Sequence, residues 1–169
     1  MGDPRRFTVF SQLIAGRFPD RTLSIADVAG GKGRLQASLR QIGFKSIVSW
    51  DTRHSYASGR RFYKYGLFDY RTAPPSYDLV IGMHPDGGTD HIICYAAKNR
   101  IPFAVCPCCP IASACAYDDG WNYVLWMRHL RSIAKRAGMF VEDLQLPITG
   151  RNKVIVGTPG AAAKRKEAA

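Results

Sequence analysis

The sequence predicts an α/β fold with a mostly parallel sheet, helices on both of its faces, and an antiparallel hairpin at the carboxyl end. Residues 24–51 follow the order strand, glycine-rich turn, helix and strand, which is the order of a βαβ unit. Residues 77–83 (YDLVIGM) form a continuous apolar run, which is typical of a strand buried in the middle of a parallel sheet. Two strand-like segments around a turn at 149–152 predict the hairpin.

The composition indicates one compact domain. The chain has 169 residues, of which 46% are hydrophobic, enough for one full core but not for a second. We expect residues 1–159 to form this domain, and residues 160–169, which include three consecutive basic residues, to form a disordered tail. No apolar run has the roughly 18 residues of a membrane span, and the amino end lacks the apolar core of a signal peptide. We therefore expect a cytoplasmic protein that does not bind membranes.

The charge balance is strongly basic. Lys and Arg number 24 against 13 Asp and Glu, and the net charge of +11 favours a polyanionic partner. Nucleic acid is expected before a membrane surface, because no long basic amphipathic segment stands out. The alternative is a basic surface without a binding role.

The first expected helix ends before Pro19, because proline cannot continue a helix. Its apolar residues recur at helical spacing at Phe7, Phe10, Leu13, Ile14 and Phe18. We expect this helix to cover the sheet or part of a ligand pocket.

The βαβ unit has the features of a nucleotide site. A strand over 23–27 precedes the glycine-rich turn over 29–33, a helix opens near Arg34, and a strand over 46–50 ends at Asp51. The glycines let the backbone approach a ligand, and the helix start offers N–H groups. Asp51, 18 residues past Gly33, is placed to accept from ribose hydroxyls. The alternative is a structural tight turn.

The details of the turn exclude two phosphate-binding patterns. A dinucleotide fingerprint requires glycine where this chain has Gln36, and a P-loop requires Ser or Thr where it has Gly33. Asp27 would repel a pyrophosphate but suits an ammonium or sulfonium group.

These residues resemble the first motif of class I S-adenosylmethionine methyltransferases, which is an acid followed by x-Gly-x-Gly-x-Gly. Ala29 replaces the first glycine, while Gly31 and Gly33 match. The resemblance implies a Rossmann-like sheet of seven strands, with the last strand antiparallel to the others. It also implies S-adenosylmethionine as the cofactor, with its methionine end at Asp27, Ala29, Gly31 and Gly33 and its ribose at Asp51.

A basic and aromatic segment follows at 52–64, where we expect a loop with a short helix. Arginines hold phosphates and aromatic rings stack on bases, so this composition favours RNA contact. The candidates are Arg53, Arg60, Arg61 and Lys64. A solvated loop with aromatic rings packed on the core would have the same composition.

A short third strand is expected over 65–68, ending at Asp69. The methyltransferase resemblance implies that an acid at this strand end faces the adenine. Asp69 has a simpler alternative role, which is to cap a turn or to pair with a neighbouring arginine.

The central strand over 77–83 runs into a His-Pro-Asp-Gly turn, and a helix is expected from Asp90 to about Asn99 with Thr89 as its N-cap. Ligands of open α/β sheets lie at the carboxyl ends of strands, so this turn is expected beside the reactive end of the cofactor. We therefore name His84 and Asp86 as candidate catalytic residues that orient or deprotonate the acceptor, with His84 also near the cofactor. A purely structural histidine is the alternative.

A strand over 102–105 leads into a cysteine cluster at Cys106, Cys108, Cys109 and Cys115. Four thiols suggest zinc, but structural zinc sites pair two separated knuckles, and Cys108 and Cys109 are adjacent. We expect reduced thiols at a strand end and no metal site.

The pairing of "DLVIGMHPDGGTD" with "FAVCPCCP" resembles the methyltransferase branch that includes the eukaryotic tRNA 2′-O-methyltransferases of the acceptor stem. That branch has a His-x-Cys-Gly-x-Ala-Thr-Asp segment before a strand that ends in Cys-Cys-His. The matching residues are His84, Gly87, Thr89, Asp90, Cys108 and Cys109. The chain departs from the pattern at Asp86 and Pro110 and lacks one residue between Gly87 and Thr89.

The remaining chain is expected to form a long helix from Asp118 to Gly138 and a hairpin of strands over 140–148 and 153–156. Arg128, Arg131 and Lys135 form a basic stripe on this helix, and we expect it to bind RNA.

The function expected from these features is methyl transfer from S-adenosylmethionine to RNA, either tRNA or rRNA, with a possible protein partner that supplies substrate recognition. A small-molecule or protein methyltransferase is one alternative. The other is a degenerate methyltransferase fold that acts as a binding module in a ribonucleoprotein.

Overall fold

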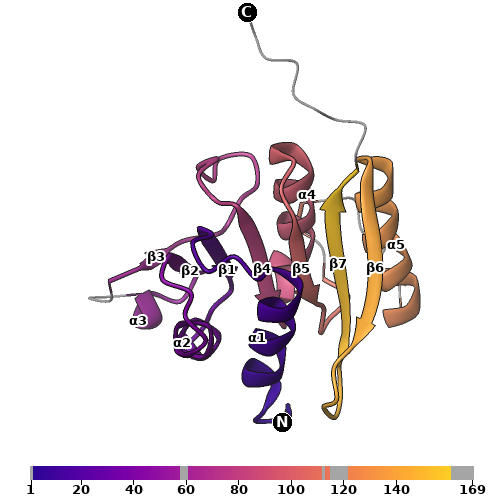
Figure 1. The fold of residues 1–169 in the computed structure, drawn as a ribbon. Coiled ribbons are helices and arrows are strands. Elements are labelled where there is room, and N and C mark those ends of the chain that lie inside the picture. The colour runs from indigo at the N-terminus through magenta and orange to yellow at the C-terminus, as the bar shows by residue number, and fades with distance from the viewer. Residues whose placement is uncertain (1, 58–60, 112, 115–121, 161–169) are drawn as a thin grey trace, which may run out of the picture.

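The computed structural model describes residues 2–57, 61–111, 113, 114 and 122–160. They form a seven-stranded sheet in the order β3-β2-β1-β4-β5-β7-β6 (Figure 1). The strands are β1 (Ile25–Val28), β2 (Ile47–Asp51), β3 (Tyr63–Tyr65), β4 (Leu79–Met83), β5 (Phe103–Cys106), β6 (Met139–Gln145) and β7 (Lys153–Pro159). Strands β1 to β5 pair in parallel, and β7 is antiparallel to both of its neighbours. The predicted fold class is confirmed.

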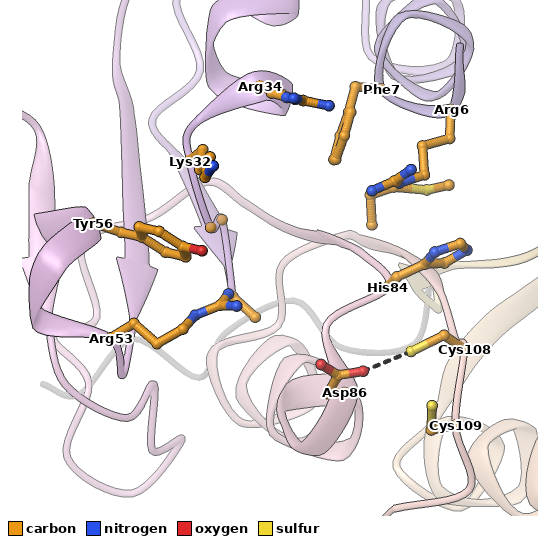
Figure 2. Close-up of a pocket in the computed structure, with 14 residues that line it drawn as sticks. Arg6, Phe7, Lys32, Arg34, Arg53, Tyr56, His84, Asp86, Cys108 and Cys109 are labelled. Carbon is orange, nitrogen blue, oxygen red and sulfur yellow. Dashed lines mark hydrogen bonds between the residues drawn. The ribbon is translucent and has the colours of Figure 1, made fainter. Parts of the chain in front are cut away.

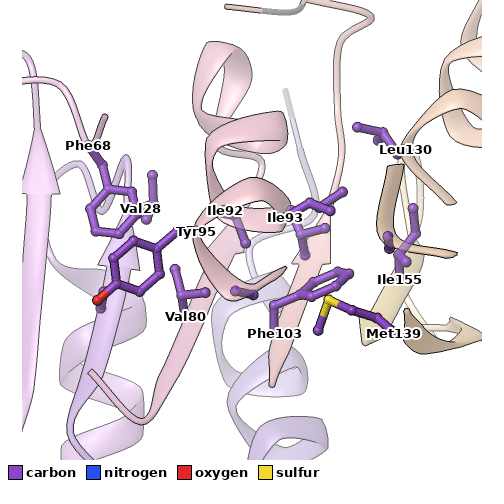
Figure 3. Close-up of a cluster of buried hydrophobic side chains, with 14 of the residues drawn as sticks. Val28, Phe68, Val80, Ile92, Ile93, Tyr95, Phe103, Leu130, Met139 and Ile155 are labelled. Atoms are coloured by element: carbon purple, nitrogen blue, oxygen red, sulfur yellow. The ribbon is translucent and has the colours of Figure 1, made fainter. Parts of the chain in front are cut away.

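Helices cover both faces of the sheet. They are α1 (Arg6–Arg17), α2 (Arg34–Gln41), α3 (His54–Ala57), α4 (Thr89–Asn99) and α5 (Tyr123–Arg136), with a 3₁₀ turn at Asp86–Gly88. On one face, α4 and α5 pack on the sheet through a cluster that includes Ile92, Phe103 and Leu130 (Figure 3). On the other face, α1 and α2 contribute Phe10 and Leu39 to a second buried cluster. None of the helices in the described ranges has the length and apolarity to cross a bilayer.

The third strand was predicted over 65–68, but β3 begins two residues earlier, at Tyr63, and ends three residues earlier, at Tyr65. Tyr63 pairs with Ser49 and Tyr65 pairs with Asp51. Gly66 then takes a φ of +135°, which glycine tolerates, and the chain leaves the sheet. Phe68 was predicted in the strand because it is apolar, but its ring packs into the core beyond the strand.

The start of α4 also differs from the prediction. Thr89 is the first helical residue, and its hydroxyl donates to the Asp86 carbonyl at 2.9 Å, so it is not the N-cap. The preceding 3₁₀ turn runs directly into α4, which moves the cap position to Gly88.

At the carboxyl end, Asn122 caps α5 by accepting from the N–H groups of Val124 and Leu125. The predicted helix start at Asp118, the disordered tail from 161 onward, and the candidates Arg60 and Cys115 lie outside the described residues. Strand β6 ends at Gln145 and not at Ile148 as predicted, because the Ile148 N–H donates to the Leu146 carbonyl at 2.8 Å in a tight turn.

The contact between β5 and β7 gives the first prediction. A Cβ on Gly157 would overlap the buried ring of Phe103, so Gly157→Ala should destabilise the domain by about 1–3 kcal/mol. Gly16, in α1, has no atom within 4 Å of its Cβ position, so Gly16→Ala should instead stabilise by about 0.5–1 kcal/mol. Urea unfolding of both variants checks this, and equal midpoints would contradict the packing at β5 and β7.

Candidate functional site

Two adjoining cavities lie at the carboxyl ends of the parallel strands β1, β2, β4 and β5. The larger, about 460 Å³, is called the basic pocket and is drawn in Figure 2. Its lining includes Arg6, Phe7, Lys32, Arg34, Arg53, Tyr56, His84, Asp86, Cys108 and Cys109. The smaller, about 310 Å³, is called the aromatic pocket, and its lining includes Val28, Trp50, Asp51, Leu67, Phe68 and Pro85. Ala29, Arg53 and Asp86 line both, so the two cavities form one divided cleft.

The glycine-rich turn forms the floor between the two pockets. Ala29, Gly31 and Gly33 all have positive φ values, of 55°, 56° and 75°. A Cβ on Gly33 would overlap the Tyr63 hydroxyl, so this position requires glycine for both space and conformation. Ala29, which stands where the methyltransferase motif has glycine, adopts the left-handed conformation despite its side chain. The turn therefore has a left-handed backbone at all three positions that align with the glycines of the motif.

Asp51 is almost fully buried at the end of β2 and accepts four hydrogen bonds. The Gly31 N–H donates to Oδ2 at 2.8 Å. Arg53 donates its backbone N–H and Nε to Oδ1 at 2.9 and 2.8 Å, and its terminal nitrogen to Oδ2 at 2.8 Å. Burial acts to raise the pKa of Asp51, but the bonds from Arg53 and Gly31 outweigh it and lower the pKa. Asp51 is therefore a fixed carboxylate whose outer side is covered by an exposed arginine.

The aromatic pocket offers an apolar slot beside Asp51. Trp50 is held by a 2.9 Å hydrogen bond from its indole N–H to the Tyr77 hydroxyl, and its ring meets Phe68 edge-on at 5.4 Å. Leu67 is 50% exposed on the pocket wall. A flat ring can pack in such a slot while a neighbouring hydroxyl reaches Asp51.

Asp69 does not line either pocket. Its Oδ1 accepts from the Arg71 backbone N–H at 3.0 Å and lies 3.6 Å from Nδ1 of buried His91. The turn after β3 thus uses Asp69 for local pairing, which is the alternative that the sequence left open.

Asp27 lies beneath the glycine-rich turn and not on a pocket wall. It is 1% exposed, and the Ser49 hydroxyl donates to its Oδ2 at 2.8 Å. Burial is the main cause that raises its pKa to about 7, against the opposing bond from Ser49. A Cβ on Gly30 would come 2.5 Å from Oδ2, so the turn packs directly on this carboxyl group. Asp27 supports the turn from below.

His84 and Asp86 follow β4 with positive φ values of 56° and 47°. Such backbone strain in residues other than glycine clusters at functional sites. Nε2 of His84 lies 2.8 Å from the Arg151 carbonyl, so the neutral ring donates there and keeps Nδ1 as a proton acceptor. Burial lowers the pKa of His84, against the Arg151 bond, and favours this neutral form.

The described thiols do not converge on one point. Cys106 is buried with its sulfur 3.5 Å from the Arg151 carbonyl, while Cys108 donates to Asp86 Oδ1 at 2.9 Å. In the described part of the chain, one group of three side chains could hold a metal ion. It consists of Asp86, Cys108 and Cys109, whose potential ligand atoms lie within 4.8 Å of one another. Burial raises the pKa of Cys106 to about 12 and that of Cys108 well above its usual range.

Purified protein should therefore contain no stoichiometric zinc, because a metal at Asp86, Cys108 and Cys109 would have to displace the proton of Cys108, whose pKa burial raises. Addition of a chelator should leave the melting temperature unchanged. Metal analysis of the untagged protein checks this, and a value near one zinc per chain would show that Asp86, Cys108 and Cys109 form a metal site.

Several pocket residues were not found from the sequence. The first helix was expected to cover the sheet or part of a ligand pocket, and its Arg6 and Phe7 line the basic pocket, although neither was named as a site residue. Lys32 lies in the glycine-rich turn and Arg34 at the start of the helix that follows, and the sequence analysis assigned neither of them to the site. Tyr56 stacks under Arg53, whose guanidinium carbon is 4.5 Å from the ring centre.

The predicted RNA-binding residues fall into two groups at opposite ends of the sheet. Arg53 lines the pockets, and Arg61 and Lys64 are exposed near edge strand β3. The stripe on α5 lies beside β6 at the other edge, where Arg131 donates to Asp143 at 2.7 Å (Figure 1). The structure therefore does not bring the two groups together.

The same fold occurs in solved methyltransferase structures. A SAM-dependent methyltransferase from Aquifex aeolicus matches with a TM-score of 0.57 and 12% identity, over 92% of this chain and 93% of that one. A methyltransferase from Pyrococcus furiosus matches with a TM-score of 0.63 and 10% identity, over 90% and 83%. CalO1, a methyltransferase in calicheamicin biosynthesis solved with SAH bound, matches with a TM-score of 0.55 and 16% identity, over 90% and 54%.

No family model matches the sequence, and the comparison with curated proteins finds no match. At these identities the structural likeness establishes the fold, and this chain has the fold of S-adenosylmethionine-dependent methyltransferases. The resemblance to the class I family is confirmed at that level. The resemblance to the tRNA branch stays a prediction.

Proposed function

We propose that this chain is an S-adenosylmethionine-dependent methyltransferase that acts on RNA. The observation that carries the cofactor assignment is Asp51, a buried carboxylate at the end of β2 that accepts from the Gly31 N–H beside an aromatic slot. A ribose with two hydroxyls and an attached flat base suits this pair of features.

The residues of the cleft fit the parts of S-adenosylmethionine. Asp51 would accept from the ribose hydroxyls, and Trp50, Leu67 and Phe68 would pack on the adenine. The methionine end would lie over the turn at Ala29 and Gly31, which faces the basic pocket. When bound, this cofactor supplies an activated methyl group, so the protein mainly aligns the acceptor and excludes water.

His84 and Asp86 would act on the acceptor. Both lie at the end of the central strand β4 and line the basic pocket. Neutral His84 can take a proton at Nδ1, since Nε2 is committed to the Arg151 carbonyl. Asp86 can orient an acceptor hydroxyl or amine, with its carboxylate held by the Cys108 thiol.

The basic surface supports RNA as the substrate class. Three of the predicted RNA-binding residues, Arg53, Arg61 and Lys64, are exposed around the cleft end of β2 and the adjoining edge strand. The net charge of +11 adds long-range attraction for a polyanion. The basic stripe on α5 (Arg128, Arg131 and Lys135) would contact the same RNA only if that RNA reached across the sheet. Otherwise it would bind a different partner.

One observation favours the binding-module alternative. Arg53 occupies both carboxylate oxygens of Asp51, so a ribose must displace at least part of this pairing. In a chain that has lost catalysis, the ion pair between Arg53 and Asp51 would stay formed and no ribose would bind there.

Calorimetric titration with S-adenosylmethionine and with its demethylated product separates the two functions. The enzyme should bind both ligands at one site per chain, and should transfer a labelled methyl group to RNA from cells that lack the protein. Absence of cofactor binding would overturn the proposed function and leave the binding module.

A further inference from the structure

We propose that the basic pocket is the acceptor site and that it binds a phosphate group next to the atom that receives the methyl group. This inference rests on the proposed function and specifies its substrate class. The ligand chemistry is a phosphate ester, carried by the backbone of RNA or by a phosphorylated small molecule.

The charges of the pocket point to an anion. Four cationic side chains line it, namely Arg6, Lys32, Arg34 and Arg53, whereas Asp86 supplies the single carboxylate among the described lining residues. Asp51, outside this lining, neutralises Arg53 by direct pairing. The cations of the lining therefore still outnumber its acid by three to one. Helix α2 also begins at Arg34 without a capping side chain, so its first N–H groups add partial positive charge at the same wall.

The cofactor alone does not balance these charges. S-adenosylmethionine carries one carboxylate, one ammonium and one sulfonium group, so its methionine end has a net charge of +1 and a single anionic group. One cation of the pocket is enough for that carboxylate. The positive charge of the lining, added to the ammonium and sulfonium groups of the cofactor, favours a second anion in the pocket.

The positions of the cations suit a group beside the acceptor. They come from α1, the glycine-rich turn, the start of α2 and the segment after β2, and Figure 2 shows them on the pocket walls together with His84 and Asp86. Among the described residues, Nε of Arg6 is buried without a hydrogen-bond partner, and the charge of Arg6 acts on His84. A phosphate held here would lie next to the candidate catalytic residues.

Two flat rings accompany the cations. The guanidinium of Arg6 lies 4.4 Å from the ring centre of Phe7, and that of Arg53 lies 4.5 Å from the ring centre of Tyr56. Both rings line the basic pocket. Phosphate-binding cations alternating with aromatic rings are the usual composition of a site for single-stranded nucleic acid.

The test uses Lys32→Gln and Arg34→Gln, with Lys45→Gln as the matched control. Lys45 is an exposed lysine just before β2. It therefore lies at the amino ends of the parallel strands, whereas the pockets lie at their carboxyl ends. A single-stranded RNA of about 12 nucleotides, within the usual site size of such proteins, and inorganic pyrophosphate are titrated into the full chain saturated with S-adenosylhomocysteine. The affinity for S-adenosylhomocysteine is measured separately for each variant.

Removal of one charge-assisted hydrogen bond should weaken the binding of both probes by about tenfold in each pocket variant and by less than about twofold in the control. The slope of log affinity against log salt should become shallower by about 0.7 for each RNA phosphate that a variant no longer neutralises. The affinity for S-adenosylhomocysteine should stay within about threefold of the unmodified chain, since only one cation is needed for its carboxylate.

One outcome is that the chain binds pyrophosphate, and loses that binding in Lys32→Gln and Arg34→Gln, without binding RNA. That result would support the phosphate site and assign it to a phosphorylated small molecule. If the pocket variants weaken neither probe more than the control does, the inference is overturned. A chain that binds S-adenosylhomocysteine but neither probe would overturn the phosphate site alone. A chain that binds pyrophosphate but not S-adenosylhomocysteine would overturn the proposed function alone.

Discussion

Asp51→Ala should weaken the binding of S-adenosylhomocysteine by at least about tenfold, because hydrogen bonds from ribose hydroxyls to a carboxylate contribute about 1.5–3 kcal/mol. Asp51 is 3% exposed and is anchored by the Gly31 N–H, so its oxygens are fixed in place and a ribose has to displace only the bonds from Arg53. Little ordering of the carboxylate is needed on binding, which keeps its contribution large. Calorimetry on the purified variant measures the loss.

Two controls make this result specific. Circular dichroism and thermal melting should show that Asp51→Ala remains folded, although the Gly31 N–H loses its acceptor. Arg53→Ala should retain cofactor affinity, since it removes the competitor for the Asp51 oxygens and leaves the oxygens themselves. If Asp51→Ala binds S-adenosylhomocysteine as well as the unmodified chain does, the ribose assignment is wrong.

The order of the main elements was predictable because local patterns determine it. The glycine-rich turn, the apolar run of β4 and the hairpin of β6 and β7 each combine a turn signal with a matching hydrophobic period. The error at β3 has a tertiary cause. Phe68 looks like a strand residue, but it is buried by α4, where its ring meets Tyr95 at 5.0 Å (Figure 3).

The site was predictable only where it depends on strand ends. Asp51, His84 and Asp86 all lie at the carboxyl edge because each ends or closely follows a parallel strand. The methyltransferase resemblance placed Asp69 beside the adenine, but β3 ends at Tyr65, and the irregular chain that follows takes the acid away from the pockets. The first helix was expected to cover the sheet or part of a pocket, but its spacing does not indicate which of its residues reach the site, and the packing of α1 brings Arg6 and Phe7 there.

Asp27 was predicted at the end of a strand over 23–27 and lies in β1 (Ile25–Val28), one residue before its end, but its surroundings were not predicted. The sequence suggested a carboxylate facing a cationic ligand, whereas the structure buries it between Ser49 and the turn. The burial of Asp27 depends on how closely Gly30 packs on its carboxyl group. That packing follows from the pairing of β1 with β2, which places Ser49 beside Asp27. A buried acid of this kind titrates in an unusual range and makes the stability of the domain depend on pH.

The unfolding free energy should fall as pH rises from about 4 to about 7 because of Asp27. Its pKa is 3.8 when unfolded and about 7 when folded, mainly through burial. Between these values the folded state holds a proton that the unfolded state has released, so stability decreases with pH. The loss is complete above about pH 7 and amounts to about 4 kcal/mol, since each pKa unit corresponds to about 1.4 kcal/mol.

Asp27→Asn removes this titration while keeping an oxygen that accepts from Ser49. The difference in unfolding free energy, variant minus unmodified chain, should therefore grow by about 4 kcal/mol between about pH 4 and pH 8. Taking the difference cancels His84, His91 and His129, whose lowered pKa values act in the opposite direction. As a control, Asp20→Asn should show a small change of opposite sign, because hydrogen bonds from Thr22 lower the pKa of that exposed acid. Urea unfolding at each pH measures this difference in unfolding free energy. If the difference for Asp27→Asn does not vary with pH, Asp27 is not buried as a protonated acid beneath the turn.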